Sequence, residues 1–151
     1  MLKKLLFILF LISCSSSDFL HAQYYEKAYG ERNDREGVYF QSVSNGYIIA
    51  GTALDTTYNT RGYYILKIDK RGQKVWEKQY SDAFSAYTYG LTVLDNGNIA
   101  IVGTHAGIFY TALAEVLLLD SMGNFLGSQT YPPLDGWGTS GVGIVKTADS
   151  S

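Results

Sequence analysis

The feature that most constrains the fold is an internal repeat with a period of 51 residues. The same residue type returns at this interval at a tyrosine, an aspartate and a glycine: Tyr29, Tyr80 and Tyr131; Asp69 and Asp120; Gly72 and Gly123. A unit of about 50 residues is typical of one blade of a kelch-type propeller and longer than most solenoid units. The sequence therefore predicts tandem copies of one structural unit.

Each unit reads as four short strands separated by turns. Strand-like residues bounded by Gly, Asn and Asp predict strands in the first unit at 37–43, 47–54, 63–69 and 73–80. The second unit repeats this series at 89–94, 98–104, 114–120 and 124–131. Thirteen tyrosines and sixteen glycines against two prolines favour strands and tight turns. We therefore expect an all-β fold of four-stranded antiparallel units.

The turn residues support these boundaries. Asn45-Gly46 and Asn96-Gly97 predict type I′ hairpins, because this dipeptide tolerates positive φ at successive positions. Asp69 and Asp120 each place a side-chain acceptor at the start of a turn that ends on glycine. The second strand has one more residue between its glycines in the second unit than in the first. We expect a bulge or register slip at Ala100 to absorb it.

The second strand of each unit is also the most apolar. Residues Ile48–Gly51 and Ile99–Gly103 form nearly continuous apolar runs. Such runs suit a strand that is covered on both faces better than one with a face in water. We expect these two strands to lie in the interior.

The repeat divides the chain into three parts after its leader. Residues 23–72 hold the first unit with a preceding outer strand at 24–29, residues 73–123 hold the second, and residues 124–151 hold part of a third. One unit buries too little apolar surface to be stable alone, and closed propellers have about four to eight blades. We expect an open, poorly stable pair of sheets, a fragment with further blades in the same polypeptide.

The motifs resemble those of a known family. The run Gly46–Thr52, the strand end Leu66–Asp69 and the segment Trp76–Tyr80 resemble the secreted β-propeller repeats of exported Bacteroidetes-type proteins. The resemblance covers residues 23–151. It implies β-propeller-like tandem blades, two complete and a third partial, in a ring that is not closed, and it implies no particular ligand.

The N-terminus reads as an export signal. Lys3 and Lys4 precede an apolar run at 5–12 and a Ser-rich stretch, and the run is too short to span a membrane as a helix. A signal peptide of 1–22 would end at Ala22, whereas a lipoprotein signal of 1–13 would leave Cys14 as the lipid-bearing first residue. We expect a secreted or cell-surface protein, or an outer-membrane lipoprotein of a Gram-negative bacterium, with membrane contact only through that lipid.

The sequence offers no catalytic, metal or cofactor constellation. His105 is the only histidine beyond the leader, and we read it as a polar residue at a strand end. The segment Asp95–Asn98 lacks the ligand spacing of an EF-hand loop and reads as a hairpin turn. A net charge of −2 provides no basic field for phosphate backbones. We predict no cofactor and no nucleic-acid partner.

Aromatic and acidic side chains are the remaining candidates for binding. The first candidates for sugar platforms at one face are Tyr58, Tyr87, Tyr110 and Trp137. Further members of this aromatic set are Tyr39, Tyr63, Tyr64 and Tyr89, and the alternative is that the whole set fills gaps between sheets. Four acidic residues fall near equivalent inter-unit loops, where they either line one end of a ring or are solvated: Asp34, Glu36, Asp82 and Asp135.

Three functions fit these residues. The first is an exported, non-catalytic propeller module that serves as a scaffold or as a surface for protein or glycan. The second is part of a propeller enzyme whose active site needs further blades. The third is an outer-membrane β-barrel, which the four-strand period and the short strands argue against.

Overall fold

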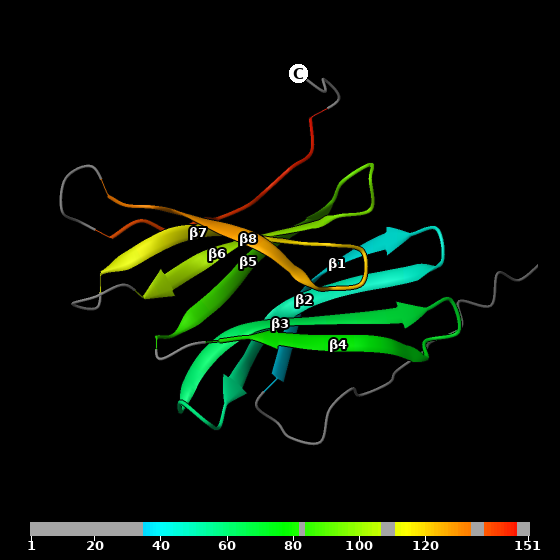
Figure 1. Ribbon diagram of the computed structural model, residues 1–151, viewed down its shortest axis with the longest axis horizontal. Coiled ribbons are helices and arrows are strands. Elements are labelled where there is room, and N and C mark those ends of the chain that lie inside the picture. Colours follow the sequence, from blue (N-terminus) through cyan, green and yellow to red (C-terminus); the bar gives the residue numbers. More distant parts are fainter. Residues whose placement is uncertain (1–34, 82–83, 107–110, 134–137, 148–151) are drawn as a thin grey trace, which may run out of the picture.

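The computed structural model describes residues 35–81, 84–106, 111–133 and 138–147, and within these ranges the protein consists of strands without helices (Figure 1). The expected outer strand at 24–29 lies outside them. The strands are β1 (Arg35–Val43), β2 (Gly46–Asp55), β3 (Thr60–Asp69), β4 (Lys74–Tyr80), β5 (Ala86–Val93), β6 (Ile99–Ala106), β7 (Ala112–Leu119) and β8 (Phe125–Tyr131).

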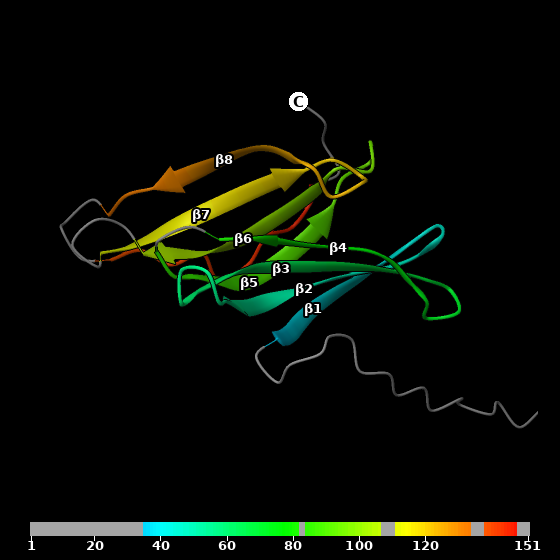
Figure 2. The same cartoon turned by 60° about the horizontal axis from the view of Figure 1, so that its bottom comes forward.

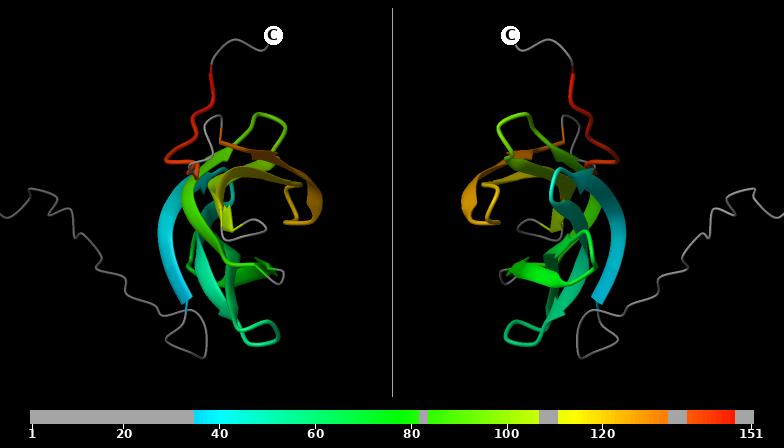
Figure 3. Two further views of the ribbon diagram at one scale, coloured as in Figure 1. Left: turned by 90° about the vertical axis from the view of Figure 1, so that its left-hand side faces the viewer. Right: turned by 90° about the vertical axis from the view of Figure 1, so that its right-hand side faces the viewer.

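The strands form two antiparallel sheets of four. Sheet A has the order β1-β2-β3-β4 and sheet B the order β5-β6-β7-β8, so each strand pairs with its neighbours in sequence. The predicted four-stranded units are therefore confirmed. Figures 1 and 2 show the sheets as two layers. In Figure 3 they lie close together at β1 and β5 and fan apart toward β4 and β8.

The main core lies between the sheets. Sheet A contributes aliphatic and aromatic side chains from β2 and β3, and sheet B contributes aliphatic side chains from β6 and β7. Ile65 and Ile101 are fully buried in it. Burying one such side chain contributes roughly 1.5–3 kcal/mol, so this row of contacts is the main stabilising interaction between the sheets. Its central members are Ile48, Ala50, Tyr63, Ile65, Ile99, Ile101, Leu117 and Leu119.

The middle strand of sheet B is covered on both faces, as its sequence predicts. Every residue of β6 from Ile99 to Thr104 is buried. Sheet A covers one face, and the segment 138–147 approaches the other, where the Gly141 amide donates to the Gly103 carbonyl oxygen over 3.3 Å. In β2, Ile48 and Ala50 are buried while Ile49 is only half-buried. The prediction thus holds fully for β6 and in part for β2.

The extra residue of the second unit lies in a turn, which corrects the expected bulge at Ala100. Val43 pairs with Gly46, so two residues connect β1 to β2. Between β5 and β6 the Leu94 amide donates to the Asn98 carbonyl oxygen over 2.8 Å, which leaves a three-residue turn. Ala100 itself sits in unbroken register with β5 and β7. A turn can take up one residue without disturbing the pairing of a buried strand, whereas a bulge there would break two ladders.

The expectation of type I′ turns at the two Asn-Gly pairs is wrong. Positive φ occurs at the glycines, 151° at Gly46 and 83° at Gly97, and not at Asn45 or Asn96. In the three-residue β5–β6 hairpin only the last turn residue needs the left-handed region, so glycine is required at Gly97 and Asn96 is free of that demand. In the two-residue β1–β2 turn neither Ser44 nor Asn45 has positive φ, and Gly46 is already the first residue of β2. Asn96 instead accepts a hydrogen bond from the Asn98 amide through its side-chain oxygen over 3.0 Å.

The two aspartate turns form as predicted. The Asp120 Oδ1 atom accepts hydrogen bonds from the amides of Met122 and Asn124, both over 2.8 Å. Gly123 closes this turn with a φ of 78°. The turn at Asp69 repeats the arrangement, with Gly72 at a φ of 71°.

The charge of Asp120 should make stability depend on pH. The amide of Asn124, followed by its side chain, stabilises the ionised carboxyl and lowers the pKa of Asp120 below 3.8. A lowered pKa in the folded state means that the stabilisation is complete above the unfolded-state pKa of about 3.9 and disappears as the pH falls through the folded-state value. Asp120→Asn should therefore lose stability relative to the native protein near pH 6 and converge with it in acid. Urea unfolding across this range measures the difference. A difference that does not change with pH would contradict the expectation.

Gly103 on β6 packs directly against Tyr63 of sheet A, and alanine should not fit there. A Cβ atom at this position would lie 2.6 Å from the Tyr63 ring and 2.1 Å from the carbonyl oxygen of Tyr87 on the neighbouring strand β5 of its own sheet. Overpacking of this kind costs about 1–3 kcal/mol. We expect Gly103→Ala to lower the free energy of unfolding by that amount in urea titrations. Gly127→Ala is the matched control, because nothing lies within 4 Å of its Cβ position; equal losses in both variants would contradict the close approach.

Candidate functional site

A cavity of about 560 Å³ is lined by residues of both sheets. Strands β2, β3 and β4 contribute from sheet A, and strands β5 to β8 contribute from sheet B. The aromatic residues in the walls are Tyr63, Tyr80 and Phe125. The polar residues in the walls are Asp55, Gln79, Ser81, His105, Glu115, Ser128 and Thr130.

A buried carboxylate forms the inner end of this cavity. Glu115 on β7 is only 9% exposed, and its Oε2 atom accepts a hydrogen bond from the Tyr63 hydroxyl over 3.0 Å. Tyr63 is itself 3% exposed, so both groups lose hydrogen bonds to water on folding. The hydrogen bond between the two sheets compensates for part of that loss. The bond orients Glu115 toward the space between the sheets.

The donors beside Glu115 are hydroxyl groups on the neighbouring strand β8. Thr130 pairs with Glu115 and Ser128 with Leu117, so these side chains share one face of sheet B, and both residues line the cavity. Gln79 points to the other face of sheet A, because it pairs with Tyr64 and alternates with Tyr80 along β4. The cavity therefore combines an acceptor at Glu115 with hydroxyl groups at Ser128 and Thr130.

The aromatic wall is held by contacts at its rim. The Tyr80 hydroxyl donates to the Gly123 carbonyl oxygen, and its ring centroid lies 6.2 Å from that of Phe125. Burial, and next the negative charge of Asp120, raise the pKa of Tyr80, so it remains a neutral donor near pH 7. The two rings provide an apolar surface in the cavity wall.

Asp55 and His105 also line the cavity. Asp55 ends β2 and accepts hydrogen bonds from the Ser81 hydroxyl and, over 2.7 Å, from the Thr57 amide. These bonds, that of Ser81 foremost, lower the pKa of Asp55 below 3.8. His105 lies near the end of β6, as expected of a polar residue at a strand end, and its ring meets Phe84 edge-on with centroids 6.0 Å apart.

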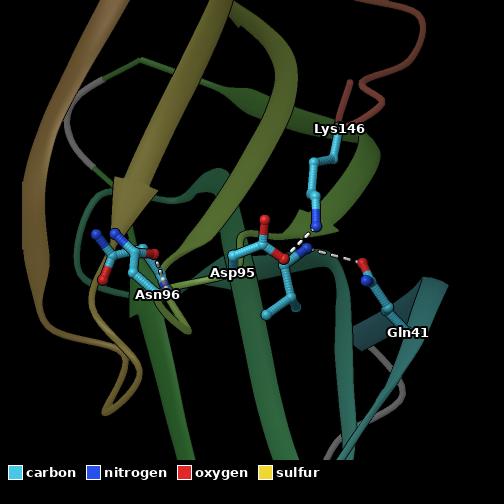
Figure 4. Close-up of polar contacts among 6 residues, drawn as sticks. Gln41, Asp95, Asn96 and Lys146 are labelled. Atoms are coloured by element: carbon cyan, nitrogen blue, oxygen red, sulfur yellow. Dashed lines mark hydrogen bonds and ion pairs between the residues drawn. The ribbon is translucent and has the colours of Figure 1, made fainter. Parts of the chain in front are cut away.

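A second hollow of about 650 Å³ lies among the hairpin turns at the opposite strand ends. There the Gln41 side chain accepts a hydrogen bond from the Val93 amide over 2.8 Å, and Lys146 forms an ion pair with Asp95 (Figure 4). Asp95 and Asn96 belong to a hairpin turn, as the sequence predicts for this segment. These polar contacts join neighbouring units.

Among the described members of the predicted aromatic set, Tyr63 alone lines one of the two hollows. Tyr58 lies in the β2–β3 turn and Tyr87 on β5, with exposed fractions of 53% and 41%, and neither lines a cavity. Tyr63 and Tyr64 are buried, so they fill the interior as the alternative interpretation holds. The remaining predicted positions lie outside the described residues: Cys14, Ala22, Tyr110 and Trp137.

Of the four acidic residues expected near inter-unit loops, one lies among the described residues. Glu36 belongs to β1, where it pairs with Thr52, and not to a loop, which corrects the expectation for this residue. The other three lie outside the described residues: Asp34, Asp82 and Asp135.

Sequence reasoning missed Glu115, although one signal was present. Glu115 is the one charged residue in the strand Ala112–Leu119. At the repeat interval it corresponds to Tyr64, a buried aromatic residue. A lone carboxylate in an apolar strand is a candidate for a buried functional group, and the repeat marks the position as buried.

Comparisons with known proteins identify no family. No protein-family model matches the chain, and a search of curated protein sequences finds no significant match. In the part of the chain that the structure describes, no helix is long and apolar enough to cross a membrane. Within the same ranges, no three His, Cys, Asp or Glu side chains come together as a possible metal site.

The bond between Tyr63 and Glu115 should contribute to stability. Tyr63→Phe removes the donor and leaves a buried carboxylate unsatisfied, which costs about 1–3 kcal/mol. Tyr64→Phe is the neighbouring control, because the Tyr64 hydroxyl donates to Glu77 over 2.9 Å in a less buried setting. We expect the Tyr63 variant to lose more stability than the Tyr64 variant in chemical denaturation. Equal losses would contradict the role of the buried pair.

Proposed function

We propose that the chain is an exported, non-catalytic β-propeller-type repeat module that binds glycan in the cavity between its sheets. Two observations support the architecture: each sheet is a four-stranded meander, and the second repeats the pairing of the first. The leader-like N-terminus supports export, either as a secreted or cell-surface protein or as a lipoprotein of the outer membrane.

The observation that carries the binding proposal is the composition of the cavity wall. A polyhydroxylated ligand needs acceptors and donors in reach of its hydroxyls and an apolar surface for its ring face. Glu115 supplies the acceptor, the hydroxyls of Ser128 and Thr130 can donate, and Tyr80 with Phe125 forms the aromatic surface. The volume of about 560 Å³ falls within the range of about 300–1,000 Å³ found for small-ligand pockets.

The negative charge of the cavity wall favours neutral sugars over anionic ones. Asp55 and Glu115 line the cavity, and no Lys or Arg stands among its described lining residues. An anionic ligand would meet repulsion from both carboxylates. Neutral hexoses and their disaccharides remain the best match in charge, size and hydrogen-bonding capacity.

Saturation-transfer NMR on the intact chain tests this proposal. We expect transfer to one or more members of a panel of glucose, galactose, N-acetylglucosamine and their β-linked disaccharides. Glu115→Gln and Thr130→Val should each reduce the transfer at least about tenfold, because the hydrogen-bonding groups of a site discriminate strongly.

Tyr58→Ala is the matched control, because Tyr58 is an exposed aromatic residue outside the cavity. It should leave the sugar signals unchanged. Loss of binding in this variant with retention in Glu115→Gln would move the site to the exposed platform. No transfer from any member of the panel would overturn the glycan proposal.

A further inference from the structure

The hollow among the hairpin turns carries the opposite charge to the cavity around Glu115. It has a volume of about 650 Å³, and residues of both sheets and of the segment 138–147 line it. The charged residues among its described lining are Lys67, Lys146 and Asp95, which gives two positive charges and one negative. The cavity around Glu115 has two carboxylates and no Lys or Arg among its described lining. An anion that the cavity repels is therefore attracted by the hollow.

Lys67 supplies the positive charge that no carboxylate compensates. It lies on the face of β3 that is turned toward sheet B, because it pairs with Ile48 and follows two residues after Ile65, and both isoleucines belong to the core between the sheets. Lys67 is half-buried, and within the described residues it forms no ion pair. The buried side chains of Ile48 and Ile99 line the same hollow. An ammonium group beside aliphatic side chains loses part of its hydration, and a bound anion would compensate for that loss.

Lys146 supplies a second ammonium group that a ligand can reach. Its Nζ atom forms an ion pair with the Asp95 carboxylate (Figure 4). The side chain of Asp95 is 86% exposed and that of Lys146 is 39% exposed. Such an ion pair is weak, because water and salt screen the two charges. A ligand anion can therefore share Lys146 with Asp95.

The neutral residues of the hollow suit a ligand with hydroxyl groups. The side-chain oxygen of Gln41 accepts a hydrogen bond from the Val93 amide over 2.8 Å, so its side-chain nitrogen is the group that can donate to a ligand. Hydroxyl and amide side chains from β1 and from two hairpin turns also line the hollow: Ser42, Ser44, Asn45 and Ser121. The volume falls within the range of about 300–1,000 Å³ found for small-ligand pockets.

We propose that this hollow binds a sugar acid with a single negative charge, of the hexuronate class. The carboxylate of the ligand pairs with Lys67 and Lys146, and its ring hydroxyls bond to Gln41 and to the serine hydroxyls. A single carboxylate matches the one uncompensated positive charge, whereas a dianion would exceed it. The site is separate from the cavity around Glu115 and does not depend on the binding of neutral sugars there.

An NMR titration of the intact, isotope-labelled chain with glucuronate tests this proposal. We expect the amide signals around the hollow, those of Ser44, Asp95 and Gly97, to shift, and the signal of Glu115 to stay unchanged. Glucose lacks the charge and acetate lacks the hydroxyls, so each should bind at least about tenfold more weakly. The affinity for glucuronate should fall as the salt concentration rises, because both lysines are partly exposed to solvent.

Two charge changes should act in opposite directions. Lys67→Met keeps an apolar stem but removes the ammonium group, and should weaken glucuronate binding at least about tenfold. Asp95→Asn removes the carboxylate that competes for Lys146, and should tighten binding severalfold. Lys70→Met is the matched control, because Lys70 is exposed in the β3–β4 turn and does not line the hollow. It should leave the affinity unchanged.

Several results would overturn the proposal: no shifts around the hollow, equal affinities for glucuronate and glucose, or equal losses in Lys67→Met and Lys70→Met. Acetate that binds as tightly as glucuronate would reduce the hollow to a general carboxylate site and so contradict the assignment to a sugar acid. If Lys67→Met does not fold, Asp95→Asn decides, since Asp95 is in an exposed turn. Binding that stays the same or weakens in Asp95→Asn would then reject the pairing of the ligand with Lys146.

Discussion

Neither four-stranded sheet can bury both faces of its middle strands within its own fifty or so residues, so each depends on a neighbouring layer. The close approach at Gly103 lets the Ile and Leu side chains of β6 and β7 meet those of β2 and β3. The hydrogen bonds of Thr88 to Gly51 and Thr52 then set the register between the layers. The cavity depends on the same contact, because residues of both sheets line it.

Much of the fold could be predicted because each sequence pattern that marks a strand or a turn occurs twice, once in each unit. Strand number, strand order and the aspartate turns all emerge from residues that recur at the same interval. The position of the extra residue could not be predicted in this way. Counting residues between Gly97 and Gly103 shows that the second unit has one residue more than the first. The count does not show whether that residue lies in the turn or in the strand, because the two differ only in their hydrogen bonds. The turn takes it up, and the pairing of β6 with β7 is unbroken.

The candidate site was less accessible to sequence reasoning because its residues come from different strands of different sheets. Aromatic residues were predicted to form sugar platforms, yet Tyr63 and Tyr64 are buried in the interior and Tyr58 does not line the cavity. Glu115 carries the buried carboxylate of the cavity, and only its apolar neighbours on β7 mark it in the sequence. Only the contact between sheets brings a tyrosine hydroxyl of one unit onto the carboxylate of the next.

Native-state hydrogen exchange tests most directly whether the two sheets stabilise each other. If they do, the central amides of β2, β3, β6 and β7 should exchange through one common opening with the same free energy. The Thr88 amide, which bonds to the Thr52 side chain of the other sheet, should share that protection. Two groups of amides with separate opening free energies, one for each sheet and with Thr88 unprotected, would contradict this account.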